Sequence, residues 1–126
     1  MSIAALNYVG GLLLDSGIPY NFMYWQEKPP DDYYFVGEYI EMPSATREES
    51  GRQDSTFILR GFTRKSWLYL EQAKEKIEKH CVRTAILSDG TGIAVSYNSA
   101  VVVPTGDNEL KSIKINLDVR EWKVNG

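Results

Sequence analysis

The segment at residues 112–124, SIKINLDVREWKV, alternates apolar and polar side chains more regularly than any other part of the chain. Side chains along a β-strand point to opposite faces in turn, so this alternation predicts a strand with one buried and one solvent-facing side. Strands of that kind are typical of antiparallel sheets. The side expected to be buried carries Ile113, Ile115, Leu117 and Val119.

The alternation shifts by one residue near the end of this segment. Trp122 and Val124 are apolar, whereas the preceding pattern would place apolar residues at 121 and 123. A β-bulge accommodates one additional residue and changes which face the following side chains occupy. We therefore expect a bulge near Arg120–Glu121 that returns Trp122 and Val124 to the core side.

Two further segments predict strands that pair as an antiparallel hairpin: YYFVGEYIEM at 33–42 and STFILRGF at 55–62. The connection between them, PSATREESGRQDS at 43–55, is far longer than the two to five residues or so of a tight hairpin tip. It has almost no apolar side chain to bury, so we expect residues 44–54 of the free subunit to be disordered on the picosecond-to-nanosecond timescale. Its charged residues are Arg47, Glu48, Glu49, Arg52 and Asp54.

Two helices are predicted from residues that recur at helical spacing. In the first, at the start of the chain, the apolar residues are Ile3, Leu6, Val9 and Leu13, and Gly17 is the expected C-terminal stop; a strand is the alternative for this segment. In the second, SWLYLEQAKEKIEKHC at 66–81, the apolar stripe is Leu70, Ala73, Ile77 and Cys81, and Ser66 is the expected N-terminal cap.

The remaining segments predict short strands. The aromatic stretch 18–26 reads as an edge strand because of Pro19, and EKPPDD at 27–32 as a turn. RTAIL, GIAVSY and VVVP read as three strands, the first two joined by a two-residue turn at Asp89–Gly90. The element order predicts an α+β fold: a mostly antiparallel sheet with two helices packed on one face and a long β-hairpin. The 126 residues are expected to form a single domain, 1–126.

Composition limits the function classes. The net charge of −3 gives no positive field that would favour nucleic acid as a primary ligand, and the lone cysteine leaves no set of several cysteines for a disulfide framework or a metal site. The apolar stretch at the N-terminus has no basic region before it and is too short to cross a bilayer, so we expect neither a targeting segment nor a membrane span.

No arrangement of residues predicts catalysis. Adjacent helical residues point about 100° apart, so His80 and Cys81 do not face each other as a base and a nucleophile, and Cys81 is expected to be buried. The DGTG turn at 89–92 lacks the lysine and glycine spacing of a phosphate-binding loop. The paired carboxylates Asp31–Asp32 and Glu48–Glu49 lie in polar loops with no pocket to separate their pKa values. We expect no cofactor and no metal.

The element order and several stretches resemble the tail-completion (tail-terminator, head-tail joining) proteins of long-tailed bacteriophages and prophages. The stretches are IPYNFMYWQEKPPDDYYFVGEYIE at 18–41, the insert TREESGRQDS at 46–55, STFILRGFTR at 55–64 and SWLYLEQAKEKIEKH at 66–80. The resemblance implies a virion structural protein, assembled in the bacterial cytoplasm, that forms a ring, often hexameric. The ring caps the tail tube and joins it to the head.

What the resemblance implies for partners follows from that role. The chain would contact copies of itself, the tail tube and head-connector proteins, with no membrane and no sequence-specific nucleic acid as a partner. The long hairpin would order against a neighbouring subunit, which makes its charged residues, Arg47, Glu48, Glu49, Arg52 and Asp54, candidate subunit contacts. A tolerated surface insertion is the alternative for the hairpin. A head-closure, connector or minor tail subunit, or a small ligand-binding domain or enzyme, are the alternatives for the function.

Overall fold

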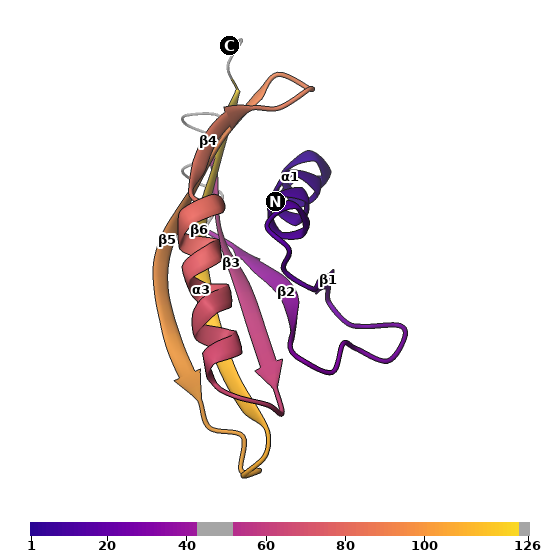
Figure 1. Cartoon of the computed structure of the whole chain (residues 1–126). Helices are drawn as coiled ribbons and strands as arrows, with labels where there is room; N and C mark the ends of the chain where they lie inside the picture. The colour runs from indigo at the N-terminus through magenta and orange to yellow at the C-terminus, as the bar shows by residue number, and fades with distance from the viewer. Residues whose placement is uncertain (43–51, 124–126) are drawn as a thin grey trace.

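The computed structural model describes residues 1–42 and 52–123 and confirms the α+β class (Figure 1). The helices and strands are α1 Ile3–Asp15, β1 Tyr20–Phe22, β2 Tyr34–Glu41, β3 Arg52–Thr63, α3 Leu68–His80, β4 Arg83–Ile86, β5 Thr91–Val103 and β6 Lys111–Lys123. The six strands form one sheet in the order β1-β2-β3-β6-β5-β4, in which only the β1–β2 pair is parallel.

Strand β6, which contains the alternating segment, lies in the middle of the sheet. It pairs with β3 from Lys111 opposite Thr63 to Trp122 opposite Arg52, and with β5 along almost its whole length on the other side. The apolar side of β6 is buried against the helices, as the alternation predicts. These buried residues are Ile113, Ile115, Leu117 and Val119.

The bulge predicted near Arg120–Glu121 is wrong. Pairing with β3 continues through Arg120 and Glu121 without interruption, and the irregularity lies in β5, between Tyr97 and Ser99. Glu121 therefore continues the core-facing series, and Trp122 lies on the opposite face, where its indole covers Gly92. A Cβ on that glycine would lie 2.3 Å from the indole, so the close approach requires glycine. Val124 lies outside the described residues.

Hydrogen bonds to the first helix explain why a carboxylate occupies this core position. Glu121 is only 5% exposed, and its Oε1 accepts a 2.5 Å bond from the Ser2 hydroxyl. The Ser2 backbone N–H lies 3.3 Å from each carboxylate oxygen. The Ser2 Oγ also accepts from the Ala5 N–H at 3.1 Å and so caps α1. A carboxylate beside a helix N-terminus is favourable because the unpaired N–H groups there carry partial positive charge.

The two helices cover the same face of the sheet (Figure 1). The stripe predicted for α3 is confirmed, with Leu70, Ala73, Ile77 and Cys81 all buried. The predicted cap is wrong: the N-cap position is Trp67, which has no side-chain capping bond, although the Ser66 Oγ accepts from the Leu68 N–H at 3.2 Å.

The first helix is confirmed, but its apolar stripe begins later than predicted. The buried residues are Ala5, Val9 and Leu13, four residues apart, whereas Ile3 is 79% exposed at the start of the helix. The helix ends at Asp15, and Gly17, the expected stop, follows just after the C-cap Ser16 with a φ of +79° that suits glycine. The Gly17 and Ile18 N–H groups return to the carbonyls of Leu14 and Leu13, which satisfies the last turn of the helix.

Three strand predictions require correction. The segment 18–26 forms only the short edge strand β1, which runs parallel to β2. The connection that includes the 27–32 turn returns the chain to the end of the sheet at which β1 begins, so both strands run in the same direction. The two segments GIAVSY and VVVP join into the single strand β5. The β4–β5 connection is a three-residue loop rather than a two-residue turn: Leu87 pairs with Thr91, and Gly90 adopts a φ of +86°.

Truncating Leu117 should test the assignment of the core face. Leu117 is fully buried in the central strand, so Leu117→Ala should lower the free energy of unfolding in urea by about 2–5 kcal/mol. The control is Ile3→Ala, because Ile3 is equally apolar but exposed, and its effect should stay within about 0.5 kcal/mol. Equal losses for the two variants would contradict the assignment.

Replacing Glu121 should test its link to α1. Glu121→Ala should lower the free energy of unfolding by about 1–3 kcal/mol, because the Ser2 hydroxyl and N–H lose the buried carboxylate that accepts their hydrogen bonds. Ser2→Ala should cost about 1 kcal/mol through loss of the cap. The double variant should lose less than the sum, since both changes remove one shared interaction. Glu75→Ala on the exposed face of α3 is the control, and additivity in the cycle would refute the link.

Candidate functional site

The charged residues of the long hairpin divide into two groups. Arg47, Glu48 and Glu49 lie outside the described residues, as does most of the segment 44–54 that we expected to be disordered. Arg52 and Asp54 belong to strand β3, which begins three residues earlier than the sequence predicted, so the expected disorder is wrong for residues 52–54. The Met42 N–H donates to the Asp54 carbonyl. Residues 52–54 of β3 also pair with β6.

Arg52 and Asp54 form an ion pair with each other. They lie two residues apart on a strand and therefore share a face. Arg52 Nε lies 2.8 Å from Asp54 Oδ1, and Arg52 Nη2 lies 2.6 Å from Oδ2. These hydrogen bonds, helped by the nearby charge of Arg120, lower the pKa of Asp54. The pair lies at the base of the hairpin, so one positive and one negative charge stand directly after residue 51.

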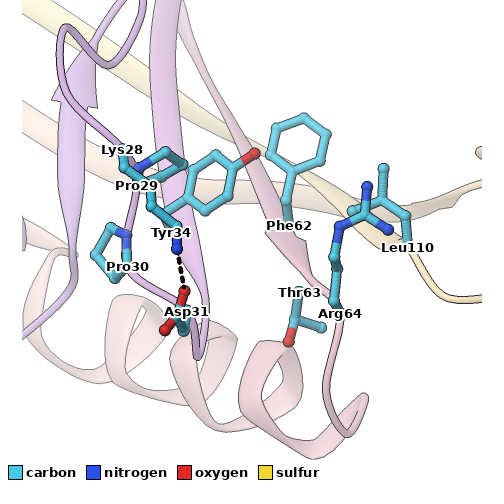
Figure 2. A pocket seen from close by; sticks show the side chains of 9 residues that line it. All are labelled: Lys28, Pro29, Pro30, Asp31, Tyr34, Phe62, Thr63, Arg64 and Leu110. Atoms are coloured by element: carbon cyan, nitrogen blue, oxygen red, sulfur yellow. Dashed lines mark ion pairs between the residues drawn. The ribbon is translucent and has the colours of Figure 1, made fainter.

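A cleft of about 230 Å³ lies at the other end of the β2–β3 pair, and Figure 2 shows the residues that line it. Tyr34 and Phe62 are cross-strand neighbours whose rings stack at 5.3 Å, and Trp25 meets Tyr34 edge-on at 6.0 Å. The turn at 28–31 forms one wall of the cleft, and Arg64 and Leu110 form the other (Figure 2).

The charged groups around this cleft are paired. Lys28 lies 3.5 Å from Asp31, and Arg64 lies 3.3 Å from Asp107. Drug-sized ligands occupy cavities of roughly 300–1,000 Å³, so this cleft suits one side chain of a partner protein better than a whole small molecule. Aromatic side chains such as those of its floor are enriched in protein-contact surfaces.

The turn after β1 presents apolar side chains to solvent. Met23 has a φ of +72°, its N–H donates to the Gly37 carbonyl, and the Tyr24 N–H returns to the Phe22 carbonyl across it. Such a γ-turn is rare and strained, because a side chain crowds the backbone at positive φ. Met23 and Tyr24 are exposed, and Phe22 stacks on Tyr39 at 6.1 Å. No residue pattern predicts this turn, since methionine is not a residue that favours positive φ.

The residues considered for catalysis have structural surroundings. Cys81 is fully buried, and burial raises the pKa of its thiol, which disfavours the reactive thiolate. Asp89 accepts a bond from the Thr91 N–H at 2.9 Å, and that bond lowers the pKa of Asp89 within the hairpin turn. Asp32 pairs with Lys65 at 2.6 Å, whereas Asp31 pairs with Lys28. The structure therefore does not bring Asp31 and Asp32 together as an acid–base couple.

Comparison with protein-family models and with curated protein sequences finds no match to this chain. Within residues 1–42 and 52–123, neither helix has the length and apolar character needed to span a bilayer. Over the same ranges, no cluster of three or more His, Cys, Asp or Glu side chains has a metal-binding arrangement.

Replacing Asp54 should reveal a pH-dependent contribution to stability. The pKa of Asp54 is lower in the folded chain than the value of about 3.9 expected when unfolded, so the ionised pair stabilises the fold above that pH. Asp54→Asn should lower the free energy of unfolding by up to about 1 kcal/mol at pH 7, because the pair is partly exposed. The difference should shrink as the pH falls below about 4 and vanish once wild-type Asp54 is protonated.

Urea titrations at pH 7 and near pH 2.5 would measure this difference, with Asp31→Asn as the control because the Lys28–Asp31 pair is largely exposed. A destabilisation that is the same at both pH values would show that the Arg52–Asp54 ion pair is not its cause.

Proposed function

We propose that this chain is a structural assembly subunit of a phage or prophage tail, which forms a ring that caps the tail tube and joins it to the head. The sequence resemblance supplies the biological setting, and the surface of the β1–β2 edge supplies the physical support. The role requires surfaces that bind other proteins and a rigid body to hold them. It requires no reaction chemistry.

Exposed apolar side chains at the β1–β2 edge, beside the base of the hairpin, are the observation that carries the proposal. Met23 and Tyr24 are exposed after β1, and Ile40 and Met42 are exposed at the end of β2, directly before residue 43. Soluble monomers seldom expose several large apolar side chains in one region unless a partner covers them. Aromatic residues and methionine are also enriched in protein interfaces.

The sheet gives this region a stiff support. Strand β3 extends beyond the end of β2 and remains paired with β6 through Gln53 opposite Glu121 and Arg52 opposite Trp122. The connection at 43–51 therefore departs from two strands of different length, one of which is anchored in the centre of the sheet. An arm with such an anchor can contact a neighbour without disturbing the core.

Shortening the connection should separate folding from assembly. Residues 43–51 would be replaced by a short linker such as Asn-Gly-Gly-Ser, which leaves Arg52–Thr63 intact. A shorter flexible loop costs slightly less closure entropy, so the midpoint of thermal unfolding should be unchanged or slightly raised. Negative-stain electron microscopy of the concentrated chain, alone and with tail tubes, should show rings or capped tubes for the wild type and neither for the variant.

A matched variant controls for general loss of solubility or fold. Leu14→Ser changes an exposed apolar residue on α1 that is not among the exposed side chains named for the β1–β2 edge, and it should leave assembly intact. Charge reversal at Arg47 should weaken assembly in a salt-dependent way if that arginine meets carboxylates on a neighbour. The proposal is wrong if the shortened chain still forms rings or caps tubes, or if the wild type does neither.

A further inference from the structure

The open face of the sheet, on the side opposite to α1 and α3, is covered by no helix of the described chain (Figure 1). Its side chains lie in cross-strand rows that the pairing of β2, β3 and β6 determines. One row places Arg60 opposite Lys114, and the next places Phe62 between Tyr34 and Ser112. Side chains on one face of a strand recur at every second residue, so the two rows are about 7 Å apart.

Lys114 lies in a positively charged part of the open face. It is opposite Arg60 on β3 and opposite Val101 on β5. Its neighbours on the same face of β6 are Ser112 and Asn116, both uncharged. The diagonal neighbours are uncharged as well: Ile58, Phe62, Ser99 and Val103. None of these positions holds a carboxylate, and no ion pair of the described residues includes Lys114.

Arg60 is only partly neutralised. Its Nε lies 2.8 Å from Glu38 Oε1, and both side chains are 44% exposed. That bond uses the Nε alone, so the two terminal nitrogens of the guanidinium can bind a second carboxylate. Like charges directly opposite each other on two strands destabilise a sheet. The Arg60–Lys114 pair therefore opposes folding of the isolated chain, and an anionic group from outside would remove that cost.

The next row provides an aromatic surface beside these two cations. The rings of Tyr34 and Phe62 stack with centroids 5.3 Å apart and form the floor of the cleft of about 230 Å³ (Figure 2). Pro29 and Pro30 line one side of the cleft, and Leu110 lines the other. A ring-containing side chain from a partner would therefore meet aromatic rings below it and apolar groups on both sides, which favours an aromatic residue.

We propose that the open face binds an extended segment of a partner protein in which an acidic residue lies two positions from an aromatic residue. Residues two positions apart in an extended segment point to the same side and are about 7 Å apart, which matches the spacing of the two rows. The carboxylate would lie between Arg60 and Lys114, and the ring would lie on Tyr34 and Phe62.

Charge complementarity confines this binding to one place. The whole chain has a net charge of −3, so it has no general attraction for acidic partners. The inference goes beyond the proposed ring, because it uses neither residues 43–51 nor the exposed side chains of the β1–β2 edge.

An NMR titration of the isotope-labelled full chain should test the proposal with a synthetic peptide. The peptide Glu-Thr-Phe-Thr-Glu, blocked at both ends, presents its ring and both carboxylates on one side when extended. It should shift the amide resonances of Arg60, Phe62 and Lys114, with a dissociation constant of about 1 mM or lower. The control peptide Glu-Phe-Thr-Thr-Glu has the same composition but turns its ring to the other side, and it should bind about threefold more weakly or worse.

Variants of Lys114 should separate binding from folding. Lys114→Gln should raise the dissociation constant about threefold or more, and Lys114→Glu about tenfold or more, since the latter also places a carboxylate opposite Arg60. Both changes remove the like-charge pair, so the midpoint of thermal unfolding should be unchanged or raised. Lys76→Gln is the matched control, because it removes the same charge from an exposed position on α3 and should leave the constant unchanged.

Four outcomes would overturn the proposal. Three are the absence of shifts at these amides, equal affinity for the two peptides, and an unchanged constant in Lys114→Gln. The fourth is a single-stranded oligothymidylate that binds the open face more tightly than the peptide, because the aromatic pair would then serve to stack bases. The variant shortened at 43–51 keeps every residue of this site and should bind the peptide as the wild type does, so failure of the ring proposal gives a different result.

Discussion

The pairing of β6 with β3 on one side and β5 on the other determines the arrangement of the rest of the molecule. It joins two long strands from opposite halves of the sheet through one central strand, over nearly the full length of all three. The core side of β6 then fixes the face on which both helices must pack, since α1 and α3 bury their apolar stripes there. Moving the register by one residue would turn Ile115 and Leu117 toward solvent and remove the surface that holds the helices.

Glu121 shows how this constraint extends to the end of the strand. Continuous pairing places residue 121 on the core side whatever its chemistry, and the chain meets that requirement with the donors of the first helix. A buried carboxylate without such partners would cost several kcal/mol, whereas here the Ser2 N–H and hydroxyl satisfy it. The same contact holds the start of α1 against β6, the last strand along the described chain, and so brings the two ends of that chain together.

The parts of the fold that could be predicted from the sequence are those with strong side-chain periodicity. The alternation through Ile113 and Val119 and the stripe through Leu70 and Ile77 place the central strand and the second helix correctly, because burial dominates there. The apparent slip at Trp122 led to the wrong bulge, since a local pattern does not reveal that a distant Ser2 can satisfy Glu121. In the same way, the parallel pairing of β1 with β2 depends on the path of the connection between them, and side-chain periodicity does not encode that path.

The candidate surfaces were predictable only in part, and for a related physical reason. The length and polarity of 43–55 drew attention to the hairpin, but Arg52 proved to be in a strand because β6 provides a partner beyond the end of β2. The turn at Met23 and the outer side of β5 beyond Val95, which β4 leaves uncovered, could not be predicted, since one depends on a rare backbone conformation and the other on where β4 ends.

Neither of these two features contributes to the stability of the isolated fold. A residue held at positive φ costs about 1–3 kcal/mol, and here it carries exposed apolar side chains that gain little from folding. The outer side of β5 beyond Val95 likewise carries two exposed valines, Val101 and Val102, and has no strand partner among the described residues. Both features become favourable when a partner covers them, because apolar area is then buried and the edge gains hydrogen bonds. Met23 follows β1 and the unpaired part of β5 lies beside β4, so the two features lie toward opposite edges of one sheet.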